Sequence, residues 1–113
     1  MATAVVIDID GTITEHDLPR AAAILHARRN NPQKPLHANI SDDGRTAYWA
    51  YPSRNEPFNA IATALWYQDC SAARGAKWLA GEVIIGGPID GNGALGPVPQ
   101  DRLDALRALT RGL

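Results

Sequence analysis

Two carboxylates near the N-terminus are the side chains with the clearest chemical potential in this sequence. Asp8 and Asp10 follow an apolar run and precede Gly11 and Thr12. A carboxylate can act as a nucleophile or as a general acid or base. Two carboxylates beside a phosphate ester would need a cation such as Mg²⁺ to offset their mutual repulsion. The pair therefore points to phosphoryl transfer as the chemistry to consider first.

The stretch from Val5 to Thr14 resembles the first signature of the haloacid dehalogenase-like phosphatases, in which an apolar strand ends in D-x-D-G-T. The resemblance implies that Asp8 is the nucleophile, that Asp10 is the acid or base, and that Mg²⁺ is bound. It is confined to this stretch. A magnesium-dependent phosphatase of this type is the alternative function for the chain.

The remaining parts of that phosphatase pattern are incomplete in the sequence, although Ser41 could serve as its phosphate-binding serine. The family carries an acidic pair after a late apolar strand, and this chain has Gly87 where one of the carboxylates is required. Only Lys34 and Lys77 could stabilise developing negative charge as lysines. We therefore expect the protein not to be an enzyme, with no catalytic residues, and keep Asp8 and Asp10 as the catalytic pair of the alternative only.

Other residues that could bind metals or phosphate do not form a known pattern. His16, His26 and His37 are too far apart in sequence for a recognisable metal spacing, and Cys70 is the only cysteine. The glycines within residues 86–93 match neither of the common phosphate-loop patterns. We expect no metal and no cofactor.

An aromatic segment offers a different kind of site. Tyr48, Trp49 and Tyr51 fall in one expected strand, where alternation places Tyr48 on one face and the other two on the opposite face. If only one face is core, one aromatic group is exposed. Arg54 follows closely, and aromatic residues and arginine are enriched at the centres of protein interfaces. Trp49, Tyr51 and Arg54 are therefore the predicted partner-binding residues.

Composition limits the class of protein. The chain has 113 residues, 45% of them apolar and 20% charged, as expected for one globular domain spanning residues 1–113. No apolar run approaches the roughly 20 residues of a membrane span, and no signal-peptide pattern is present. The net charge of −1 lacks the basic field that general nucleic-acid binding requires. We expect a cytoplasmic protein with neither membrane nor nucleic acid as partner.

Turn residues and apolar periodicity predict the element order β β α β β α (α) β α. Hairpins are expected at Asp10-Gly11, as a two-residue type I′ turn, and at Asp43-Gly44. Helices are expected over residues 19–29, from residue 58 and from residue 99, with a short further helix over residues 72–79 that Gly81 ends. The glycine-rich residues 86–97 are expected to form a loop.

This order indicates an α+β fold, a mainly antiparallel sheet with two hairpins and about three helices packed on one face. The apolar side chains with the clearest periodicity should form the core. They are Phe58, Ile61, Leu65, Val83, Ile85, Leu103 and Leu106.

Several short segments in a fixed order carry a second resemblance. They are Asp10-Gly11-Thr12, Asp43-Gly44, residues 59–65, residues 80–88 and a closing Pro-x-x-x-Leu helix. Together they resemble a small family of uncharacterised proteins, a domain of unknown function, from bacteriophages of actinobacteria. The resemblance implies a compact α+β domain made in the host cytoplasm, where host takeover is one class of role, and it implies no particular activity.

These observations favour a small phage-type accessory protein that acts as a non-catalytic interaction module. Its expected partner is a host or phage macromolecule, most simply a protein, or a second copy of the chain in a homodimer. Self-association would most easily be isologous, through a face or an edge of the sheet.

Overall fold

The computed structural model describes residues 3–30, 36–51, 56–75, 77–90 and 94–111. Within these ranges a sheet has the strand order β2-β1-β5-β4-β3, with β6 paired to β5, and neighbouring strands are antiparallel. The strands are β1 (Thr3–Ile7), β2 (Ile13–Asp17), β3 (His37–Ile40), β4 (Ala47–Tyr51), β5 (Ala80–Ile89) and β6 (Leu95–Gly96). The helices are α1 (Leu18–Arg29), α2 (Ala60–Asp69) and α3 (Gln100–Arg111), with a 3₁₀ turn η1 (Ser71–Ala73). The predicted α+β class and antiparallel sheet are confirmed.

Both predicted hairpins are present, but the first turn has a different geometry from the one expected. Asp8 N–H donates to Thr12 O (2.9 Å) and Gly11 N–H donates to Asp8 O (3.0 Å), which leaves a three-residue loop. A type I′ turn needs positive φ at both central residues. Gly11 has φ 91°, whereas Asp10 does not enter the left-handed region. The prediction of a two-residue type I′ turn is therefore wrong, because the Cβ of Asp10 disfavours the left-handed conformation.

The helices α1 and α2 begin at side-chain caps. The carboxylate of Asp17 accepts a hydrogen bond from Arg20 N–H (2.9 Å), and Pro19 follows in the first turn of α1. Asn59 caps α2 in the same way through Ala62 N–H (3.1 Å). Such caps satisfy backbone donors that have no partner inside the helix.

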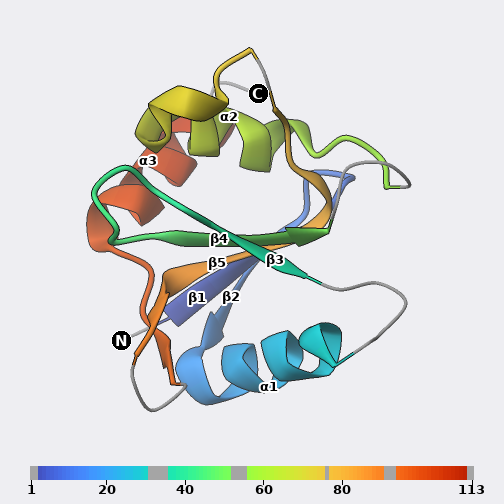
Figure 1. The fold of residues 1–113 in the computed structure, drawn as a ribbon, viewed down its shortest axis with the longest axis vertical. Coiled ribbons are helices and arrows are strands. Elements are labelled where there is room, and N and C mark those ends of the chain that lie inside the picture. The colour runs from blue at the N-terminus through green and yellow to red at the C-terminus, as the bar shows by residue number, and fades with distance from the viewer. Residues whose placement is uncertain (1–2, 31–35, 52–55, 76, 91–93, 112–113) are drawn as a thin grey trace.

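Helices cover both faces of the sheet, so the predicted single helical layer is wrong. Figure 1 shows α2 and α3 on one side of the sheet and α1 on the other. The core between the sheet and α2 and α3 includes Tyr48 and Ile85, whereas the core under α1 includes Trp49 and Ile84. The central strands are buried on both faces because their apolar residues do not alternate with polar ones.

Much of the described part of the predicted loop 86–97 is strand, while residues 91–93 lie outside the described residues. β5 continues to Ile89, and its end pairs with β6. A Cβ added at Gly87 would lie 2.7 Å from Pro97 O and 3.1 Å from Gly96 C. The glycines therefore permit close approach of two backbones, which composition alone does not distinguish from loop flexibility.

Two further expectations fail around the start of β5. The helix predicted over residues 72–79 is reduced to the η1 turn, and Gly81 is a strand residue with φ 70° rather than a helix stop. Five of the seven predicted core residues are buried, but Ile61 is only partly buried and Phe58 is 56% exposed. Phe58 precedes α2 and pairs with Ala80, so it does not belong to the helical stripe.

No helix in the described ranges has the length and apolar character needed to cross a membrane.

Candidate functional site

Trp49, the first predicted partner-binding residue, lies beneath α1. It is 7% exposed, and the guanidinium carbon of Arg29 lies 4.9 Å from the centre of its ring. Its side chain belongs to the core on the α1 side of the sheet. The expectation that Trp49 is exposed is therefore wrong, because α1 covers the face that was taken to be open.

The other two predicted residues of this surface have different outcomes. Tyr51 lies at the end of β4 and is only partly buried. Arg54 lies outside the described residues. Of the predicted set, Tyr51 is therefore the residue that the structure places at the surface.

Two large aromatic side chains that were not among the predicted binding residues, Phe58 and Trp78, are exposed near Tyr51. Ala80 pairs with Tyr51 on one side and with Phe58 on the other, and Ala80 itself is fully buried. Trp78, two residues before Ala80, is 50% exposed. Exposed aromatic residues at one end of a sheet are uncommon unless they serve an interface.

Hydrogen bonds from α2 fix the backbone that carries these aromatic residues. Thr63 Oγ1 accepts from Leu79 N–H (2.9 Å) and donates to Leu79 O (3.2 Å), which also accepts from Asn59 N–H (3.0 Å). Leu79 is buried in the core under α2. Because Leu79 is anchored in this way, the residues on either side of it, Trp78 and Ala80, have fixed backbone positions.

An ion pair lies next to the aromatic residues. Arg28 Nε of α1 donates to Glu82 Oε1 of β5 at 3.0 Å. The hydrogen bond and charge of Glu82, with smaller contributions from Tyr51 and Asp8, raise the pKa of Arg28. Tyr51, Phe58, Trp78, Arg28 and Glu82 are called the strand-end surface below.

The two candidate catalytic carboxylates, Asp8 and Asp10, both lie in the β1–β2 turn, and the charge of Asp8 contributes to the raised pKa of Arg28. Asp10 is exposed, and the Thr12 backbone N–H that donates to its carboxylate (2.9 Å) lowers its pKa. A lowered pKa keeps the carboxylate ionised, which does not favour a proton donor. Within the described residues, no three His, Cys, Asp or Glu side chains gather to hold a metal ion.

Position 87, where the phosphatase pattern requires a carboxylate and this chain has glycine, also lies far from Asp8. In the β1–β5 pair Val5 faces Ile85 and Ile7 faces Val83, so the residues after Ile85 run toward the start of β1. Asp8 follows the end of β1. The antiparallel arrangement therefore places Gly87 and Asp8 at opposite ends of the strand.

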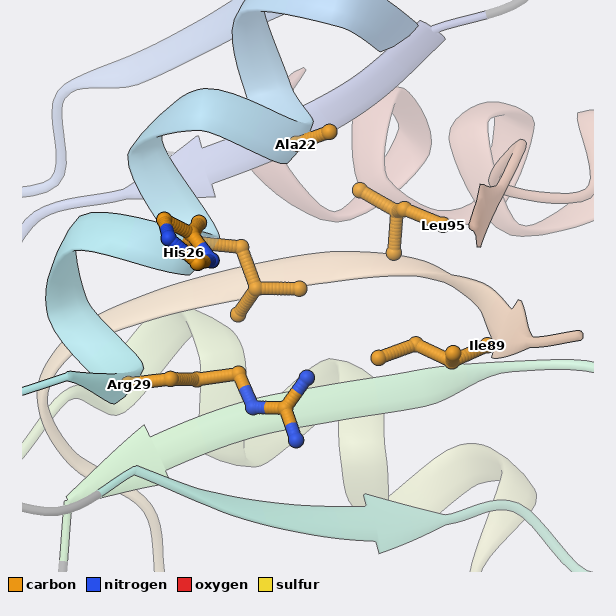
Figure 2. A pocket seen from close by; sticks show the side chains of 6 residues that line it. Ala22, His26, Arg29, Ile89 and Leu95 are labelled. Atoms are coloured by element: carbon orange, nitrogen blue, oxygen red, sulfur yellow. The ribbon is translucent and has the colours of Figure 1, made fainter. Parts of the chain in front are cut away.

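A small pocket lies between α1 and the end of β5. Figure 2 shows His26 and Arg29 of α1 facing Ile89 and Leu95 across it. Its volume is about 60 Å³. Ligand pockets usually measure about 300–1,000 Å³, so this one has no room for an ordinary organic substrate.

A buried polar cluster joins β4, α2 and α3. Tyr48 donates to Asp69 Oδ2 (2.8 Å), and Arg102 Nε lies 3.0 Å from the same oxygen in an ion pair. Arg102 also donates to Leu65 O (2.9 Å). Burial raises the pKa of Asp69 despite the opposing effects of Tyr48 and Arg102, and burial raises the pKa of Tyr48. The side chains of this cluster contact one another, so they hold β4, α2 and α3 together.

No protein-family model, curated protein or solved structure matches the chain. Its function is therefore argued from its own geometry.

Proposed function

We propose that the protein is a non-catalytic interaction module that binds another protein through the strand-end surface. The exposure of Phe58 and Trp78 beside the half-buried Tyr51 carries this proposal. Large aromatic side chains lose little conformational entropy on binding and contribute much of the energy at interface centres. The rigid backbone beneath them further lowers the entropy lost on association.

The charges of this surface favour a protein over a nucleic acid. Arg28 is already paired with Glu82, and Arg29 lies over Trp49. Both arginines therefore already contact another side chain of the chain itself. With a net charge of −1, the chain has little basic surface to neutralise several phosphates.

The setting we propose for this role is a phage accessory protein acting in the host cytoplasm, where the partner is a host or phage protein. The ordered short segments that resemble the actinobacteriophage family support this setting. The strand-end surface does not depend on it.

Affinity purification from cells that produce the protein, followed by binding measurements with the purified partner, tests the proposal. The double variant Phe58→Ser/Trp78→Ser is expected to weaken binding by about 30-fold or more, since truncation of even one true hot spot costs about 2 kcal/mol. Ala108→Ser is the control, because Ala108 is also exposed but lies in α3, outside both proposed surfaces. Wild-type affinity in the double variant would refute the assignment of the surface.

A further inference from the structure

The sheet has one outer edge that charge does not protect. β3 ends the strand order, and no described segment pairs with its outer side. Its residues, His37 to Ile40, include no Asp, Glu, Lys, Arg or Pro. Natural proteins protect a free edge by keeping it short or with charges, proline or a covering element. β3 is short, at four residues, but it has neither a charged residue of these types nor proline, so its edge can still pair.

The opposite edge, β2, is protected by charge. Glu15 and Asp17 both lie in this strand. Arg107 of α3 pairs with Glu15 at 3.2 Å. Symmetric pairing of two β2 strands would bring the carboxylates of two copies together, which is unfavourable.

The hydrogen-bond register identifies the backbone groups that β3 presents outward. Ser41 N–H donates directly across to Thr46 O (2.9 Å). In an antiparallel pair, the residues that exchange such bonds alternate with those whose N–H and C=O point away. His37 and Asn39 therefore bond to β4, and Ala38 and Ile40 present their N–H and C=O groups at the free edge.

These outward groups complement a second copy of themselves. Consider a two-fold axis that passes through Asn39 and relates two antiparallel β3 strands. Ala38 of each copy then lies opposite Ile40 of the other copy. In both pairs the two residues can exchange backbone hydrogen bonds. Ala38 faces Trp49 and Ile40 faces Ala47 across β4, so both side chains lie on the α1 side of the sheet. The exposed Ile40 would then pack over a small alanine, and the apolar layer under α1 would continue across the axis.

We infer that the protein forms a two-fold symmetric dimer by antiparallel pairing of β3 with β3 of a second copy. The two sheets join into one continuous sheet, and the interface is isologous. A single short strand contributes little area, so the dimer is weak and forms with rising concentration. This inference does not rest on the strand-end surface, which lies at another part of the sheet.

Sedimentation velocity from about 10 μM to about 1 mM tests the inference, with a shift from monomer to dimer expected over this range. Ala38→Pro removes an outward N–H, a change that an edge strand tolerates, and it should abolish the shift. Ile40→Lys places a charge at the same edge and should do the same. Thr14→Lys, on β2, is the matched control and should dimerise like wild type.

Hydrogen exchange gives a readout specific to this geometry. The amides of Ala38 and Ile40 should gain protection as concentration rises, while those of β2 do not change. Circular dichroism checks that each variant folds, and Ile40→Lys decides the matter if Ala38→Pro unfolds. A chain that stays monomeric throughout, or a dimer that survives Ile40→Lys without protection of these amides, would overturn the inference.

Discussion

At the residue scale, Asn59 connects three elements through one buried side chain. It is 1% exposed, and its amide nitrogen donates to Ile7 O of β1 (2.9 Å) and Gly81 O of β5 (2.8 Å). Its amide oxygen caps α2 through Ala62 N–H (3.1 Å). The start of α2, and with it the adjacent Phe58, is thereby fixed against the sheet.

Asn59→Asp should destabilise the protein by about 3 kcal/mol, because it leaves two buried carbonyls without donors and places a charge against them. The aspartate can still accept the hydrogen bond from Ala62 N–H, so the decrease in stability reports the two lost hydrogen bonds to Ile7 O and Gly81 O. Urea unfolding measures it. In Asn39→Asp, which removes a donor to Tyr48 O (3.1 Å) at the sheet edge, the loss should stay near 1 kcal/mol. Equal losses in both variants would contradict the argument.

At the scale of elements, the Tyr48–Asp69–Arg102 cluster holds β4, α2 and α3 together. The side chains of Asp69 and Arg102 are only 14% and 12% exposed. Removing one member of a buried ion pair leaves an uncompensated charge, which is far more damaging than removing an exposed partner.

Arg102→Met should therefore destabilise the protein by about 3 kcal/mol at neutral pH, and less in acid. The pKa of Asp69 is raised in the folded state, so folding takes up a proton and stability falls as pH rises from the ordinary carboxyl range through that raised pKa. Without Arg102, stability should fall more steeply with rising pH, because the guanidinium no longer offsets the cost of burying the Asp69 carboxylate. The free energy of unfolding, measured at several pH values in the acid range, gives the dependence of stability on pH.

Arg107→Met is the control on the same helix. Arg107 is half-exposed and pairs with the exposed Glu15, so its loss should lower stability by less than about 1 kcal/mol with no added pH dependence. An identical pH profile for Arg102→Met and wild type would show that Asp69 does not depend on Arg102.

At the scale of the whole molecule, the antiparallel topology around Asp8 differs from the parallel sheets on which many phosphate-binding sites are built. Parallel α/β sheets gather the ends of several strands at one edge, where catalytic residues from different strands meet. Here β1 has antiparallel neighbours on both sides, β2 and β5. We therefore expect the turn carrying Asp8 and Asp10 not to receive catalytic residues from the ends of neighbouring parallel strands.

The expected outcome is no Mg²⁺-dependent hydrolysis of a generic aryl phosphate, with Asp8→Asn indistinguishable from wild type. A steady-state assay with and without Mg²⁺ measures this directly. Hydrolysis that requires Mg²⁺ and disappears in Asp8→Asn would instead establish the phosphatase alternative.

Local chemistry determined much of the fold from the sequence alone. Gly11 and Gly44 marked both hairpins because only glycine enters the left-handed region easily. Apolar spacing marked α1, and the structure shows that Asp17 caps it, since periodicity and capping both depend on residues within a few positions of each other. The α+β class followed from these short-range signals, as did the burial of residues such as Leu65 and Leu103.

Only the tertiary structure decided which surfaces remain open. Trp49 and Tyr51 are two residues apart in one strand, yet α1 covers the first and leaves the second partly exposed. Phe58 fits a helical stripe in sequence, but its pairing with Ala80 turns it outward. Coverage of a sheet face and pairing between distant strands depend on contacts between residues far apart in the chain, which local periodicity does not encode.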